Sequence, residues 1–143
     1  MRGFLIDTCA ISEFTKQSPD LGLVAWLSQI DASILFVSAI TIGELRYGIT
    51  LQAEQKKRDF LERWFRSDVL VEFEGRILPF DGEVAEQWGR LRAKARKGGT
   101  PAPTIDAMIA ATALHYNLAV MTRNESDFQR LGLEVVNPWK GAR

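Results

Sequence analysis

A chain of 143 residues that is 46% hydrophobic and 25% charged has the size and mixture of one globular domain, which excludes a disordered or collagen-like chain. Its 18 Lys and Arg side chains balance 18 Asp and Glu side chains, so any binding of nucleic acid requires a local basic patch. A single cysteine excludes an internal disulfide. No apolar run approaches the roughly 20 residues that a membrane helix needs, and the sequence has no signal-peptide pattern. We therefore expect a cytoplasmic protein.

Five short strands are predicted, at residues 3–6, 34–37, 77–80, 118–122 and 133–136. The first, second and fourth are nearly continuous apolar runs, which are typical of parallel strands covered on both faces. The third contains Pro79, which lacks a backbone N–H and so places this strand at a sheet edge or ends it.

Apolar residues at helical spacing lie between these strands. Strands that alternate with helices predict an α/β fold, a three-layer sandwich around a central, mostly parallel five-stranded sheet. The Gly- and Pro-rich loop at residues 96–104 lies inside this pattern, so we expect residues 1–143 to form a single domain. The helical stripes are Leu21, Val24, Ala25, Leu27 and Ile30; Ile42, Leu45 and Ile49; Phe60, Leu61, Trp64 and Phe65; Val84, Ala85, Trp88, Leu91 and Ala95; and Ile109, Ala110, Ala113 and Leu114.

Polar residues follow the predicted strands where a parallel sheet places its functional site, beyond the carboxyl ends of the strands. Asp7 directly follows the first strand, and Glu44 lies in the segment SAITIGELRYG after the second. Asn124 and Asp127 follow the fourth strand in TRNESDF. Asp106 opens the helical segment PTIDAMIAATA and shares the apolar stripe that faces the sheet, so its carboxylate is at least partly desolvated.

Each of these side chains also has a structural interpretation, which the sequence leaves open. Asp7 has the position of a helix cap or turn residue, and Glu44 has that of a solvated helix residue. Asp106 has the position of a first-turn acid in a helix that Thr104 caps. Asn124 and Asp127 have the spacing of a capping box.

Asp7, Glu44 and Asp106 are expected to converge at one end of the sheet. Crowded carboxylates raise one another's pKa unless a cation lies between them. An all-oxygen site without Cys or His suits Mg²⁺ or Mn²⁺. His115 falls late in its helix, far from Asp106, so we interpret it as structural. The sequence therefore predicts a hard-metal site with Asp7 as a ligand at a strand end.

The segments LIDTCAIS, SAITIGELRYG, PTIDAMIAATA and VMTRNESDF, in this order, together with the closing LEVVNPW, resemble the PIN-domain ribonucleases, and most closely the VapC/FitB-type toxins of bacterial toxin–antitoxin pairs. The resemblance covers essentially the whole chain. It implies metal-dependent endonucleolytic hydrolysis of RNA, with Asp7, Glu44 and Asp106 as the acidic site residues. Asn124 stands where relatives often carry Asp, which leaves the fourth site residue open between Asn124 and Asp127.

The resemblance also implies partners: a cognate antitoxin, a second copy in a homodimer, and DNA only indirectly through the antitoxin. Apolar helix faces around residues 45–65 are the expected contact region. Two other functions remain open, a catalytically idle PIN-like binding module and a metal-dependent phosphatase or phosphotransfer domain, although Thr8 and Cys9 after Asp7 do not provide the second acid that a phosphatase needs. The candidate RNA-binding side chains are Arg46, Lys94, Arg96, Lys97 and Arg123.

Overall fold

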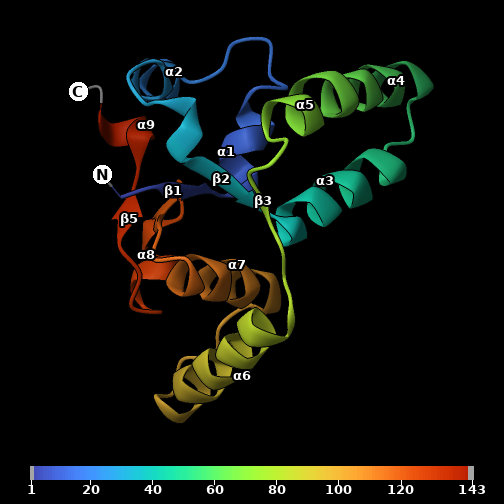
Figure 1. Ribbon diagram of the computed structural model, residues 1–143. Helices are drawn as coiled ribbons and strands as arrows, with labels where there is room; N and C mark the ends of the chain where they lie inside the picture. Colours follow the sequence, from blue (N-terminus) through green and yellow to red (C-terminus); the bar gives the residue numbers. More distant parts are fainter. Residues whose placement is uncertain (1, 142–143) are drawn as a thin grey trace.

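A computed structural model describes residues 2–141 of the chain and the side chains of residues 2–139 (Figure 1). The elements are β1 (Phe4–Ile6), α1 (Thr8–Glu13), α2 (Leu21–Ser28), η1 (Ala32–Ile34), β2 (Leu35–Ser38), α3 (Ala39–Leu51), α4 (Gln55–Trp64), the π-helical turn η2 (Phe65–Val69), α5 (Leu70–Glu72), β3 (Ile77–Leu78), α6 (Gly82–Lys97), α7 (Thr104–His115), β4 (Ala119–Met121), α8 (Glu125–Gln129), β5 (Val135–Val136) and α9 (Pro138–Gly141).

The strands form one sheet in the order β3-β2-β1-β4-β5, and every pairing among the described residues is parallel. The predicted mostly parallel, five-stranded sheet is confirmed, and in this part of the chain every strand is parallel to its neighbours. β3 lies at the edge and ends directly before Pro79, as the missing N–H of proline requires. Because all strands run the same way, their carboxyl ends meet along one edge.

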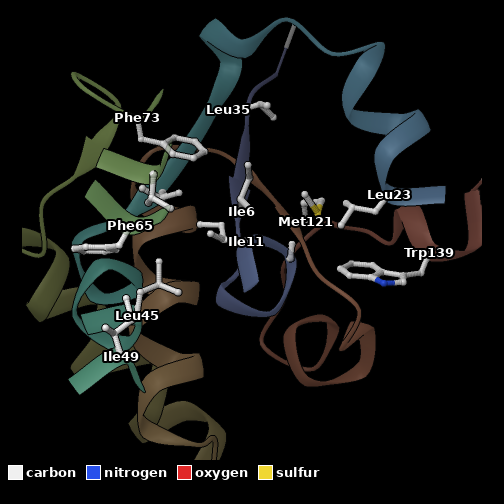
Figure 2. Packing of buried hydrophobic residues seen from close by; sticks show 13 residues of the cluster. Ile6, Ile11, Leu23, Leu35, Leu45, Ile49, Phe65, Phe73, Met121 and Trp139 are labelled. Atoms are coloured by element: carbon white, nitrogen blue, oxygen red, sulfur yellow. The ribbon is translucent and has the colours of Figure 1, made fainter. Parts of the chain in front are cut away.

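The sheet is buried on both faces, which confirms the three-layer sandwich. Successive side chains of a strand point to opposite faces. In β1 and β4, Ile6 and Met121 therefore join the core under α1, α2 and α3, shown in Figure 2, whereas Leu5 and Val120 pack against α7 and α8. Figure 1 shows the same division, with α1 and α2 on one side of the sheet and α6 and α7 on the other.

Helix α2 has a different buried face from the predicted one. Leu21 and Val24 of the predicted stripe are 83% and 41% exposed, while Leu23 is fully buried. The helix is rotated because Leu23, with Leu27 and Ile30 at helical spacing from it, packs into the core beside α9. The correction concerns the phase of the stripe and leaves the helix in place.

Helices α6 and α7 form an antiparallel hairpin that determines which residues lie near the carboxyl edge. His115, at the end of α7, lies 3.6 Å from Glu83 at the start of α6, which confirms that it is far from Asp106. The opposite end of the hairpin therefore holds the last turn of α6 and the first turn of α7. The connecting loop is residues 98–103, shorter than predicted, and Gly99 turns it with a φ of 85°. Within residues 2–141, no helix has the length and apolar character needed to cross a membrane.

Candidate active site

Asp7 is a buried carboxylate at the end of β1, 5% exposed, and its side chain has three donors. The N–H of Thr8 donates to Oδ1 at 2.7 Å, which makes Asp7 the N-cap of α1 and confirms the structural interpretation given above. The hydroxyl of Thr122 donates to Oδ2 at 2.8 Å, and the thiol of Cys9 donates to the same oxygen at 3.4 Å. These donors fix the orientation of a carboxylate that lies at the carboxyl edge of the sheet.

Thr122 is a site residue that sequence reasoning missed. Strands β1 and β4 pair with Ile6 opposite Met121, so the residues that follow, Asp7 and Thr122, lie side by side. The sequence shows that Thr122 follows a buried strand directly, as Asp7 does. It does not show that these two strands are neighbours, and that information is needed to place Thr122 beside Asp7.

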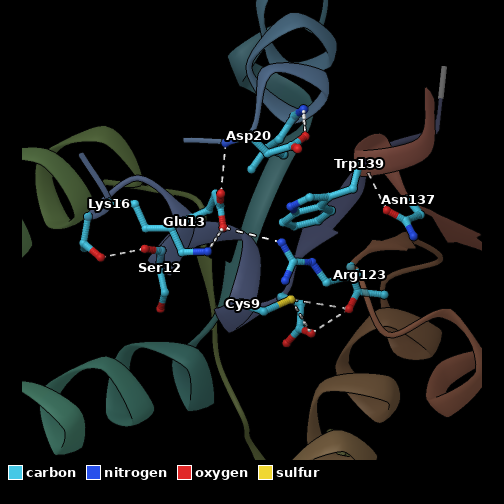
Figure 3. Close-up of polar contacts among 12 residues, drawn as sticks. Cys9, Ser12, Glu13, Lys16, Asp20, Arg123, Asn137 and Trp139 are labelled. Atoms are coloured by element: carbon cyan, nitrogen blue, oxygen red, sulfur yellow. Dashed lines mark hydrogen bonds and ion pairs between the residues drawn. The ribbon is translucent and has the colours of Figure 1, made fainter. Parts of the chain in front are cut away.

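Cys9 is half-buried, and Figure 3 shows its polar contacts. Its sulfur also lies 3.6 Å from the hydroxyl of Thr122. Burial, and next the charge of Asp7, raise the pKa of the Cys9 thiol. The thiol therefore keeps its proton and acts as a weak donor to Asp7. Cys9 is therefore not an activated nucleophile in this arrangement.

Asp106 is the third residue of α7 and is half-buried. Burial first, then the charge of Asp7 and then that of Asp127, raise the pKa of this carboxyl. No positive side chain among the described residues pairs with it. The helix-cap interpretation is corrected in one detail, because Pro103 occupies the N-cap position, Thr104 is the first helical residue, and no side chain caps the helix.

Of the other predicted acidic residues, Asp127 acts on Asp106 and Glu44 does not. Asp127 lies in α8, and its charge contributes to the electrostatic environment of Asp106. Glu44 lies one turn after Thr41 on the same face of α3, and the hydroxyl of Thr41 meets that of Thr8 at 3.4 Å.

Asn124 is the N-cap residue of α8 but makes no side-chain cap, and its N–H donates to the hydroxyl of Thr122 at 3.0 Å. The predicted capping box is therefore absent at this helix start. Asp7 and Asp127 each act on the charge of Asp106, and Asn124 is connected to Asp7 through its backbone N–H and the hydroxyl of Thr122.

The donor chemistry of this site fits a hard divalent cation. Asp7 and Asp106 offer carboxylate oxygens, and the repulsion that raises the pKa of Asp106 would be relieved by a cation between them. Among residues 2–141, no three His, Cys, Asp or Glu side chains are already grouped as metal ligands, so the expected set of Asp7, Glu44 and Asp106 is not preassembled. Mg²⁺ commonly takes one or two protein carboxylates and completes its shell with water and phosphate, which these two residues allow.

The predicted basic residues separate into two groups. Lys94, Arg96 and Lys97 lie in the last turn of α6, at the end of the hairpin that carries Asp106. Arg46 instead pairs with Glu62 at 2.7 Å and lies over the ring of Phe65. The structure therefore leaves the end of α6 as the basic surface beside the acidic site.

Arg123 belongs to a second missed feature, the buried carboxylate of Glu13 (Figure 3). Glu13 accepts the N–H of Asp20 at 2.9 Å, pairs with Lys16 at 2.8 Å, and lies 3.8 Å from Arg123. The guanidinium of Arg123 also covers the ring of Trp139, 5.0 Å from its centroid. Glu13 thereby connects α1 to α2 and to the loop that carries Thr122 and Asn124.

We expect Glu13→Gln to lower the free energy of unfolding by about 1–3 kcal/mol, because a buried carboxylate with charged donors is replaced by a neutral amide. The hydrogen bond from Lys16 is the main cause that lowers the pKa of Glu13 below its ordinary 4.5. Its stabilisation is therefore complete above pH 4.5 and is lost as the pH falls through the lowered folded-state pKa. Urea unfolding at several pH values measures this. A gap between wild type and variant that stays constant into acid would contradict it.

The fold and the site together define a parallel α/β protein with a carboxylate site at the carboxyl edge of its sheet. The PIN domain family matches residues 4–133. The chain belongs to the PIN domain family.

Named relatives agree with this assignment over nearly their full lengths. The chain is 36% identical over 138 residues to the VapC ribonuclease Y4jK of Sinorhizobium fredii, covering 96% of this chain and 99% of the relative. It is 38% identical to Toxin FitB of Neisseria gonorrhoeae, covering 94% and 97%.

Solved structures show the same similarity. The crystal structure of FitAcB from Neisseria gonorrhoeae superposes with a TM-score of 0.90 at 38% identity, covering 96% of this chain and 99% of that one. A toxin-antitoxin complex from Klebsiella pneumoniae matches with a TM-score of 0.70 at 26% identity, covering 95% and 98%.

Proposed function

We propose that this chain is a Mg²⁺- or Mn²⁺-dependent endoribonuclease and the toxin component of a toxin–antitoxin pair. The observation that carries the proposal is Asp106, a half-buried carboxylate whose pKa is raised by burial, by Asp7 and by Asp127, and with which no positive side chain among residues 2–139 forms an ion pair. Such an arrangement costs stability unless a cation is bound. The names of the relatives, a VapC ribonuclease and a FitB toxin, support RNA as the substrate.

Asp7 and Asp106 would hold the metal, with Asp127 or Glu44 as a further acidic residue of the site. A bound divalent cation lowers the pKa of a water molecule and stabilises charge at phosphorus during in-line attack. The chain's own contribution is orientation, because Thr122 and Cys9 donate to one oxygen of Asp7 and keep the carboxylate in place. The cationic last turn of α6 would hold the RNA backbone beside this site.

The test is cleavage of an RNA pool of mixed sequence by the purified chain, with metal binding followed by calorimetry on the same sample. We expect cleavage with Mg²⁺ or Mn²⁺ and none with EDTA, and we expect restoration when the metal is returned. Cleavage that persists in EDTA would contradict the metal mechanism. Metal binding without cleavage of any RNA in the pool would favour an idle binding module instead.

We also propose a second copy and an antitoxin as partners, because the relatives of this chain include a protein solved as a toxin-antitoxin complex. The predicted contact region around residues 45–65 exposes Tyr47, Leu51 and Phe60 to 65%, 64% and 49%. These side chains extend from α3 and α4 and suit contact with a second copy. Light scattering should give twice the 16.1 kDa mass of the chain, and Leu51→Asp should return it to that mass. A monomeric wild type would contradict this surface.

An apolar groove of about 510 Å³ lies on the face of the molecule formed by α1, α2 and the η2–α5 segment. Its walls include Ile11, Phe14, Leu27 and Trp64, and its charged residues, Asp68 and Glu72, are both acidic. A groove of this kind suits the apolar face of a helical segment that also carries basic residues. We therefore assign the groove to the antitoxin and the exposed residues of α3 and α4 to the second copy.

A further inference from the structure

A second cavity, of about 410 Å³, lies between the last turns of α6, the loop at residues 98–103 and the turn after α8. Its volume falls in the range of small-ligand sites. Its apolar wall is formed by Leu91, Ala95, Ala102 and Leu131. Of these, Leu131 is buried and the other three are partly buried in the same core, so the wall is part of the folded structure.

The cavity shares one residue, Asp127, with the acidic site. Asp127 forms part of its wall and is one of the two acids whose charge raises the pKa of Asp106. Pro103, also in the wall, precedes Asp106 by three residues at the start of α7. A molecule that fills the cavity therefore extends toward the carboxylates proposed to cleave RNA.

Positive side chains lie at the mouth of the cavity. Lys94 is in its wall, and Arg96 and Lys97 follow on the same helix end. Arg130, also in the wall, pairs with Asp127 at 3.0 Å. An apolar wall with cations at its mouth is complementary to a nucleotide, because the flat base prefers the apolar surface and the phosphate prefers the cations.

We propose that this cavity binds one unpaired nucleotide of the RNA substrate next to the cleaved bond, with the base inside and its phosphate at Lys94. The inference rests on the proposed ribonuclease function and adds a site that selects the base. Only a base that has left its stack can enter, so the chain selects single-stranded or looped RNA at this position.

The experiment measures RNA affinity in the Asp106→Asn background, in which the RNA is not cut. The probes are fluorescein-labelled RNA decamers of A, C or U, together with an abasic decamer that keeps the ribose-phosphate backbone. Fluorescence anisotropy at one fixed salt concentration gives each dissociation constant. Two substitutions fill the cavity from its loop, Ala102→Leu and Thr100→Trp, and Ala25→Leu is the matched control at an exposed position of α2 outside it.

We expect the Asp106→Asn protein, the parent of the other variants, to bind at least one base-bearing decamer about tenfold more tightly than the abasic decamer. Ala102→Leu and Thr100→Trp should reduce that difference to about twofold or less and leave abasic binding unchanged, because the cations remain. Lys94→Gln should weaken binding of every decamer, including the abasic one. Ala25→Leu should retain the preference for a base.

A parent with no preference for a base would overturn the inference, as would a preference that survives both filling substitutions. The metal-dependent cleavage assay separates this failure from failure of the proposed function. If the wild type cleaves RNA but the filling substitutions leave the base preference unchanged, only the proposed nucleotide site is excluded. If filling the cavity abolishes the base preference but the wild type cleaves no RNA, the nucleotide site is supported and the ribonuclease function is excluded.

Discussion

Asp106→Asn is expected to reduce RNA cleavage by at least about a thousandfold while leaving the fold intact. The substitution keeps the size of the side chain and removes the charge that would bind the metal beside Asp7. Calorimetric affinity for Mn²⁺ should fall in the same variant. Glu74→Gln, the same change from a carboxylate to an amide at an exposed position after α5, is the control and should cleave normally. Full activity in the Asp106 variant would exclude this carboxylate from the mechanism.

The same variant makes a second measurement informative, the dependence of stability on pH. The pKa of Asp106 is raised by burial and by its acidic neighbours, so the folded chain holds this proton to a higher pH than the unfolded chain does. Stability is therefore lost as the pH rises from the ordinary aspartate value of 3.8 through the raised folded-state pKa. Asparagine cannot ionise and avoids the loss.

At neutral pH without metal, we expect Asp106→Asn to melt about 1–2 °C above the wild type, a small gain because the side chain is half in solvent and its charge is screened. Below pH 3.8 the two proteins should melt together. Mg²⁺ should raise the melting temperature of the wild type and not that of the variant. A variant that melts below the wild type at neutral pH would show that the carboxylate stabilises the fold.

The parallel sheet and the proximity of Asp7 to Asp106 could be predicted from the sequence, because both depend on local patterns. Asp7 follows an apolar strand, and Asp106 shares the stripe of a helix that packs on the sheet. Parallel strands then bring these ends together. The basic end of α6 lies near Asp106 because a short loop between two helices makes an antiparallel hairpin, which the structure shows.

Other features of the site could not be predicted, because they depend on how elements far apart in the sequence are placed next to one another. Thr122 reaches Asp7 only because β4 pairs directly with β1, and strand order is not written in any local pattern. That Asp127 and not Glu44 raises the pKa of Asp106 depends on the position of a short helix, α8, relative to the first turn of α7. The contacts of Arg46 and Arg123 likewise require partners far along the chain, Glu62 and Glu13.

Thr122→Val is the second variant with a large expected effect, a loss of about 10–100-fold in metal affinity and in cleavage. Valine matches the shape of threonine but cannot donate to Oδ2 of Asp7 at the 2.8 Å position that the hydroxyl occupies. It also removes the acceptor of the Asn124 N–H. Leaving these buried groups without partners should lower the free energy of unfolding by about 1–3 kcal/mol. Calorimetry, cleavage rates and urea unfolding measure the three effects.

Two further variants separate orientation of Asp7 from a general loss of structure. Thr122→Ser restores the hydroxyl and should recover most of the metal affinity, even where it remains less stable than the wild type. Cys9→Ala removes the other donor to the same oxygen, and because a thiol is a weak donor, we expect a loss of less than about threefold. If Thr122→Ser fails to recover metal binding while its stability approaches that of the wild type, then the hydroxyl of Thr122 does not position Asp7. If it recovers binding as expected, the contact between the ends of β1 and β4 is what presents Asp7 to the metal.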